Sequence, residues 1–198
     1  MKYTLVADGA SDAILIPILT WSVRRCIASP VESQWTDFSR IPLQPDFESK
    51  LRVALDLFPC DVLFVHRDAE GQPPEWRRNE IAAALKDTTI THVPVVPVRM
   101  TEAWFLFDES AIRAAAGNPN GKENLNLPGI STLEDIPDAK QVLYKALSQA
   151  CGRNVRRRST FPVSKRVHLL PNYIDDYSPL KVLSAFQTLQ QDIRSIFL

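Results

Sequence analysis

The sequence predicts an α/β protein with a mostly parallel sheet flanked by helices, on three observations. Short apolar runs alternate with longer segments whose apolar residues recur every three or four positions, as strands and helices do in crossover units. One run, residues 62–65, is apolar at every position, which is typical of a strand buried on both faces of a parallel sheet. The composition of the 198 residues, 45% hydrophobic and 23% charged, is that of a folded domain rather than a disordered or fibrous chain.

The elements follow one another in strand and helix order. Residues 3–7 predict a first strand, and a helix is expected from Asp12 to about Arg25, with Pro17 kinking it or shifting its start. Two prolines, Pro94 and Pro97, make residues 92–98 an irregular or edge strand, because proline cannot donate a ladder hydrogen bond. The other expected elements are a weak strand at 32–38, helices at 47–58 and 75–86, a helix beginning at Thr101, and helices at 138–150 and 179–196.

Charge is distributed unevenly along the chain. Residues 1–138 hold 13 Lys and Arg against 20 Asp and Glu, whereas residues 139–198 hold 10 against 3, although the net charge is zero. A chain without net charge is not expected to coat nucleic acid through bulk charge alone. We therefore expect an α/β domain over residues 1–150, with a basic helical C-terminal segment over residues 151–198 packed on it.

The basic segment is the candidate nucleic-acid contact. Its cations surround Phe161, and such a run can bind the phosphate backbone or dock on an acidic partner. The candidate residues are Arg153, Arg156, Arg157, Arg158, Lys165 and Arg166.

Neither cysteine chemistry nor a membrane span is indicated. The three cysteines are widely spaced and form no Cys-x-x-Cys pair, so we expect small thiols in a reducing compartment. The longest apolar run, residues 13–21, is far shorter than the roughly 20 residues that a membrane helix needs. We expect a cytoplasmic protein that does not contact a membrane.

Acidic residues follow two of the expected strands directly. Asp8 follows the first strand, and His66 and Asp68 end the strand at 62–65. The carboxyl ends of parallel strands form one edge of a sheet, where ligands bind, and converging carboxylates suit Mg²⁺. We interpret His66 as a hydrogen-bonded neighbour rather than a ligand, and Asp12 as a carboxylate in the first turn of a helix.

Four motifs resemble a known family. Residues 5–12, Leu-Val-Ala-Asp-Gly-Ala-Ser-Asp, resemble the opening motif of the Toprim domain, and residues 62–68, Val-Leu-Phe-Val-His-Arg-Asp, resemble its second motif, a buried strand ending in Asp-x-Asp. Residues 101–108, Thr-Glu-Ala-Trp-Phe-Leu-Phe-Asp, and residues 138–140, Asp-Ala-Lys, are similar to elements of a Toprim-like family of small bacterial proteins. Genes of that family often neighbour an ABC-type ATPase. The motifs occur in the family's order over residues 1–150.

The resemblance implies a divalent-metal-dependent nuclease or phosphodiester-processing protein that uses one or two Mg²⁺ or Mn²⁺ ions. Asp8 would be a ligand or general acid/base, Asp68 the principal ligand and Glu102 a further ligand, while Lys140 would lie beside the phosphate. The implied partners are nucleic acid, either DNA or RNA, and an ABC-type ATPase in phage or mobile-element defence.

Two departures from the family pattern leave an alternative open. Asp8 stands where Toprim enzymes usually have Glu, and His66 stands at the first Asp of Asp-x-Asp, although histidine is a poor ligand for Mg²⁺. The alternative is a catalytically degenerate module that regulates or docks on an ATPase. A small-molecule phosphatase or nucleotide-binding domain is disfavoured, because the sequence holds no Gly-rich phosphate loop.

Overall fold

A computed structural model gives the structure of residues 1–152 and 154–197. The chain forms two compact units. The sheet unit comprises Met1–Val98 and Ala185–Leu198, and the helical unit comprises Arg99–Ser184. This division follows contacts within the fold and falls at residue 98, whereas the division drawn from motif order and charge falls at residue 150.

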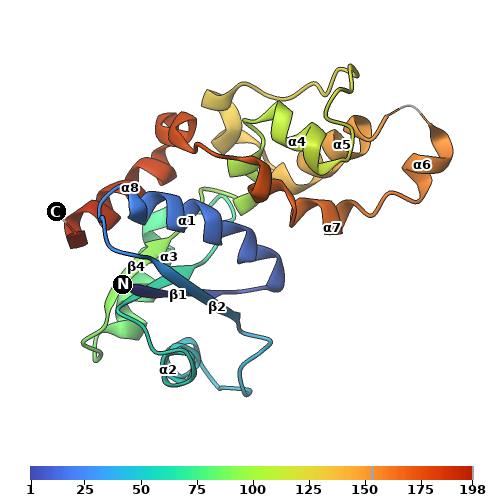
Figure 1. The fold of residues 1–198 in the computed structure, drawn as a ribbon. Helices are drawn as coiled ribbons and strands as arrows, with labels where there is room; N and C mark the ends of the chain where they lie inside the picture. Colours follow the sequence, from blue (N-terminus) through green and yellow to red (C-terminus); the bar gives the residue numbers. More distant parts are fainter. Residues whose placement is uncertain (153, 198) are drawn as a thin grey trace. The chain divides into compact units, whose positions relative to one another are not determined.

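The sheet unit is built on four parallel strands in the order β2-β1-β3-β4 (Figure 1). Their bounds are β1 Lys2–Ala7, β2 Glu32–Asp37, β3 Val62–His66 and β4 Thr91–Val95. The predicted α/β class, a parallel sheet flanked by helices, is therefore confirmed. The chain moves from β1 to one side to form β2 and returns to the other side to form β3. Open parallel sheets bind ligands at such a reversal, outside the carboxyl ends of the strands.

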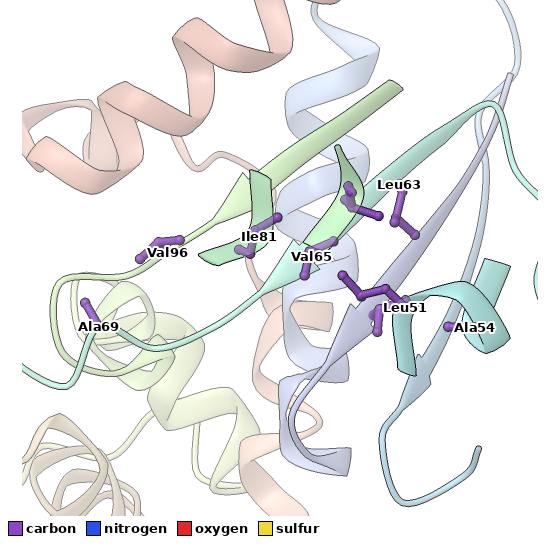
Figure 2. Packing of buried hydrophobic residues seen from close by; sticks show 9 residues of the cluster. Leu51, Ala54, Leu63, Val65, Ala69, Ile81 and Val96 are labelled. Carbon is purple, nitrogen blue, oxygen red and sulfur yellow. The ribbon is translucent and has the colours of Figure 1, made fainter. Parts of the chain in front are cut away.

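One face of the sheet is covered by α2 (Phe47–Leu57) and α3 (Pro74–Leu85). Alternate strand residues point to the same face, and apolar side chains from both helices meet them (Figure 2). Figure 2 shows this core around Leu63 and Val65 of β3, with Leu51 and Ala54 of α2 and Ile81 of α3. Asp46 begins α2 as a side-chain cap, because its carboxylate accepts the backbone N–H of Ser49 at 2.7 Å.

The opposite face carries α1 (Leu15–Arg24), which follows a 3₁₀ turn at Ala10–Ile14. The Tyr3 hydroxyl of β1 donates to the Ile16 carbonyl at 3.0 Å, which ties the strand to this helix. Pro17 stands in the first turn of α1, where a missing N–H costs nothing, so the proline shifts the start of the helix as expected. The C-terminal helix α8 (Ser184–Phe197) also joins α1, since Gln190 donates to the Ser22 hydroxyl at 2.5 Å.

Strand β4 lies at the edge of the sheet, where its proline predicted it. Pro94 lies opposite Val65 in the register, and an edge strand tolerates its missing donor. The other edge is β2, which pairs with β1 alone among the four strands.

The helical unit contains no strand within its described residues, 99–152 and 154–184. Trp104 and Phe105 are buried in it, as are Leu143 and Leu147 of the long helix α5, which packs against the turn at Thr101–Phe105. Its elements are 3₁₀ turns at Thr101–Phe105, Ile130–Asp135, Leu170–Tyr173 and Ser178–Val182, and helices α4 Glu109–Ala115, α5 Ala139–Ala150, α6 Val155–Ser159 and α7 Val163–Val167.

Two expected helices begin elsewhere than predicted. The segment from Thr101 forms only a 3₁₀ turn before α4, which is capped by the Asp108 carboxylate. The expected helix at 179–196 is also interrupted, because Leu183 is extended at φ −88° and ψ 135°, and α8 begins after it. In the part of the chain that the structure describes, no helix has the length and apolar character to cross a membrane.

Candidate functional site

The backbone after β3 stays strand-like and fixes the side chains that follow. The N–H groups of Arg67, Ala69 and Gly71 donate in turn to the carbonyls of residues 95, 97 and 98, at 3.0–3.2 Å. Side chains of an extended backbone alternate between faces, and Ala69 accordingly joins the core beneath α2 and α3. His66 and Asp68 project on the other side, toward the turn that precedes α1.

A buried ion-pair group, the His66 group, comprises Asp12, His66 and Asp68. The imidazole is 1% exposed and lies between two carboxylates. Its Nε2 is 3.2 Å from Asp68 Oδ1, and its Nδ1 is 3.4 Å from Asp12 Oδ2. The same Asp12 oxygen accepts the Gly9 N–H at 3.0 Å, which links the group to the turn after β1.

The two carboxylates keep the His66 ring charged. Burial alone would lower the pKa of His66, but the hydrogen bonds and charges of Asp12 and Asp68 outweigh it and raise the pKa to about 9. Burial would likewise raise the pKa of Asp12, yet contact with His66 and the Gly9 N–H holds that pKa below its ordinary value. With a pKa of about 9 the ring is an imidazolium at neutral pH, protonated at both nitrogens and without a lone pair for a metal.

A second, more exposed ion-pair group, the Arg67 group, comprises Asp8, Arg67, Glu80 and Arg77. Arg67 Nε lies 3.0 Å from Asp8 Oδ2, and its Nη1 lies 3.3 Å from Glu80 Oε1. Arg77 holds the other Glu80 oxygen at 3.0 Å and also donates from Nε to the Asp68 carbonyl at 3.3 Å. The Arg67 guanidinium also lies over the Phe47 ring, 4.9 Å from its centroid.

Asp8 is the most exposed carboxylate of the His66 and Arg67 groups, with 49% of its side chain in contact with solvent. Partial burial raises its pKa above the ordinary value; Arg67 and His66 act against that shift, and Asp12 and Asp68 add to it. The rise shows that the folded chain disfavours the Asp8 charge. A cation bound at this carboxylate would offset the cost of partly burying its charge.

The structure places the expected metal ligands in two units. Asp8 and Asp68 belong to the sheet unit, whereas Glu102 belongs to the helical unit. There Glu102 is buried and its carboxylate lies 3.5 Å from Lys140 Nζ, so two motifs that are distant in sequence meet within the helical unit. Lys140 is thus paired with a carboxylate in the structure.

The basic segment is only partly engaged in the fold. Arg156 and Lys165 are exposed, whereas Arg158 donates to the Gly152 carbonyl at 2.6 Å. Arg166 donates to the Ala115 carbonyl at 3.2 Å and lies 5.8 Å from the Phe161 ring centroid. Arg153 and the side chain of Arg157 lie outside the described residues.

The donor chemistry at the sheet edge fits a hydrated divalent cation. At this edge five carboxylates contact three cations: Asp8, Asp12, Asp68, Glu80 and, outside the two groups, Glu70, against His66, Arg67 and Arg77. Within residues 1–152 and 154–197, no set of three or more His, Cys, Asp or Glu side chains is arranged to hold a metal ion. Mg²⁺ is often held by only one or two carboxylates together with water and substrate phosphate. Asp8 and Asp68, 49% and 29% exposed, are the residues that would provide them.

Several residues of the site were not identified from the sequence. Arg67, Glu80 and Arg77 take part in four of the six ion pairs at this edge, and nothing in their spacing distinguishes them from ordinary surface charges. Asp12 carried a signal, because it stands three residues after a glycine at a strand end, where its carboxylate can bind the turn N–H.

Comparison of the chain with protein-family models, with curated proteins and with solved structures found no match.

Proposed function

We propose that the sheet unit binds Mg²⁺ or Mn²⁺ at Asp8 and Asp68 and processes phosphodiester bonds of nucleic acid. The observation that carries the proposal is the position of these two solvent-accessible carboxylates, 49% and 29% exposed. They follow the central strands β1 and β3, at the reversal of the sheet where ligands bind in this architecture. The resemblance of residues 5–12 and 62–68 to the Toprim motifs supports the same two residues.

The surrounding charges have distinct tasks in this proposal. His66 and Asp12 orient Asp68 from the buried side, and Arg67 orients Asp8 from the side of α2 and α3. The carboxylates exceed the contacting cations by two, so a divalent ion would balance the edge. A bound cation would supply polarisation of a phosphoryl oxygen and stabilisation of a leaving oxygen.

The helical unit would contribute the nucleic-acid contact. Arg156 and Lys165 are exposed cations on short helices of the basic segment, which suits contact with phosphates. By family resemblance, the protein would work with an ABC-type ATPase in defence against phage or mobile elements. Arg158 and Arg166 are expected to support the segment, since they bind backbone carbonyls of their own unit.

One observation favours a second function, a non-catalytic module that docks on an ATPase. Both Asp8 and Asp68 contact a cationic side chain of the protein, and the residue at the first Asp of the Asp-x-Asp motif is a protonated histidine. A site whose charges are paired internally can be a structural remnant of a metal centre.

Titration calorimetry with Mn²⁺ and Mg²⁺ separates the two functions. We expect the wild type to bind Mn²⁺ and each of Asp8→Asn and Asp68→Asn to weaken binding by roughly tenfold or more. Asp87→Asn is the matched control, because Asp87 is exposed and lies between the end of α3 and the start of β4, on the side of the strands' amino ends. It should bind like the wild type.

If the protein is instead a non-catalytic docking module, the expected results are the opposite. The wild type would then bind neither cation, and it would form a complex with the ATPase that Asp68→Asn leaves unchanged. That pair of results would reject the metal-dependent function.

A further inference from the structure

A hollow beside the Arg67 group has no role in the proposed cation site. It has a volume of about 400 Å³ and is lined by Gln72, Trp76, Arg77 and Glu80. Trp76, in the first turn of α3, is 63% exposed, whereas Trp104 is almost completely buried. An exposed indole that forms a wall of a hollow offers a flat face to a ligand.

The hollow is held in shape by the ion pairs of the site. Arg77 is fixed at three points: Nε donates to the Asp68 carbonyl, Nη1 lies 3.0 Å from Glu80, and Nη2 lies 3.6 Å from Glu70. The rim before α3 turns at Gly71, whose φ of 80° suits glycine, and Gln72 N–H then donates to the Ala69 carbonyl at 2.9 Å. The protein side of the hollow is therefore already formed in the absence of a ligand.

The lining provides the kinds of group that bind a nucleobase. Its four residues offer an aromatic face, a planar guanidinium, an amide that can donate and accept, and a carboxylate that accepts. Unstacked bases are bound by stacking on aromatic rings and by hydrogen bonds to their edges.

The position of the hollow connects it to the proposed chemistry. Arg77 lines the hollow and bonds the backbone of Asp68, and Glu80 lines it and pairs with Arg67, which in turn holds Asp8. The hollow therefore shares residues with the contacts that hold the Asp68 backbone and the Asp8 side chain, and we expect the strand that carries a bound base to continue toward these carboxylates. A base inside a duplex cannot offer its face to an indole, because its neighbours cover it.

We propose that this hollow binds one unpaired base, stacked on Trp76, and that the substrate of the site is single-stranded nucleic acid. The inference rests on the proposed function, since it names the substrate class of the same edge. It does not need the cation, because stacking and hydrogen bonding to a base require none.

The test is binding of a short labelled oligothymidine strand in EDTA, followed by fluorescence anisotropy. We expect Trp76→Ala to weaken binding roughly tenfold or more, because stacking on one aromatic ring contributes about that factor. Trp76→Phe should keep most of the affinity, since it retains a ring. Leu57→Ala is the matched control: Leu57 is an exposed apolar residue at the last turn of α2, and its removal should change nothing.

A second readout distinguishes stacking from a general effect on the surface. Binding of the strand should quench part of the indole emission of the wild type, and Trp76→Phe should lack that part. Circular dichroism of the variants checks that each is folded. The same strand annealed to its complement should bind more weakly and should be insensitive to Trp76→Ala.

Three results would overturn the inference: a wild type that binds no strand, a Trp76→Ala variant that binds like the wild type, or equal losses for single strand and duplex. The calorimetry separates this failure from that of the proposed function. Strand binding through Trp76 in a protein that binds no cation would keep the base site and reject the metal chemistry. Cation binding in a protein indifferent to Trp76 would do the reverse.

Discussion

The two ion-pair groups at the carboxyl edge of the sheet use the same chemistry in different surroundings. In the His66 group the cation is almost completely buried between two carboxylates, and its pKa is raised to about 9. In the Arg67 group the cation contacts carboxylates that are 49% and 36% exposed. Asp8, in this second group, has its pKa raised rather than lowered.

This contrast indicates which group supports the fold and which is accessible to a ligand. A buried cation that loses its partners is costly, so the His66 group should contribute to stability. An exposed ion pair contributes little to the free energy of unfolding. A charged carboxylate whose pKa is raised in the folded state lowers that free energy. The buried group therefore orders the edge and presents Asp68, whereas the exposed group contributes Asp8, the more accessible of the two proposed ligands.

The largest effect is expected from removing the buried cation. His66→Ala leaves Asp12 and Asp68 without the charge between them, and we expect the free energy of unfolding at pH 7 to fall by about 3 to 5 kcal/mol. Urea denaturation followed by circular dichroism measures it. His66→Gln, which keeps a donor toward Asp68, should lose less and provides a folded variant if the alanine variant unfolds.

His92→Ala is the control for the loss of an imidazole. His92 is half-buried on β4, with its Nδ1 3.4 Å from the Ile90 carbonyl, and we expect a loss of under about 1 kcal/mol. Equal losses for His66→Ala and His92→Ala would show that the buried group has no special role.

The next effect is a pH dependence with a defined direction. Because the pKa of folded His66, about 9, exceeds its ordinary value of 6.5, its stabilisation is complete below pH 6.5 and is lost as the pH rises through 9. A shift of this size corresponds to roughly 3 kcal/mol in the free energy of unfolding. Urea midpoints between pH 6 and pH 9.5 measure the loss, and NMR of the imidazole protons measures the pKa itself.

The same series on His66→Gln isolates this residue from the other groups that titrate. Tyr3, whose pKa burial raises to about 12, changes its charge only above this range in the folded chain. The variant should show a flatter profile than the wild type above pH 6.5. An imidazole that titrates near its ordinary pKa would contradict the charged His66 group.

The fold was predictable where a local pattern decides the structure. The apolar run of β3 indicated a buried parallel strand, and Pro94 placed β4 at an edge, because both rules act on the residue itself. The extent of the helical unit was not predictable in this way. It depends on contacts between α4, α5 and the segments after residue 160, which no local pattern records.

The candidate site divides along the same line. Asp8 and Asp68 could be named because each follows the end of an expected strand. Arg67 could not be assigned to Asp8, because that contact depends on the face to which the residue after β3 points. Trp76 could not be recognised as exposed, because burial of a helical residue is decided by what packs against it.

The smallest effect, and one of opposite sign, is expected at Asp8. Since the raised pKa shows that the folded chain disfavours the charge, Asp8→Asn should leave the free energy of unfolding unchanged or raise it by up to about 1 kcal/mol, the small size following from the half-exposed side chain. In saturating Mn²⁺ the wild type should instead be more stable than the variant. A ligand that binds only the folded state stabilises it, and the variant lacks a carboxylate that holds the ion. Thermal denaturation with and without Mn²⁺ measures both halves. A variant less stable than the wild type in EDTA would place Asp8 with the residues that support the fold, and would remove the distinction between the two groups.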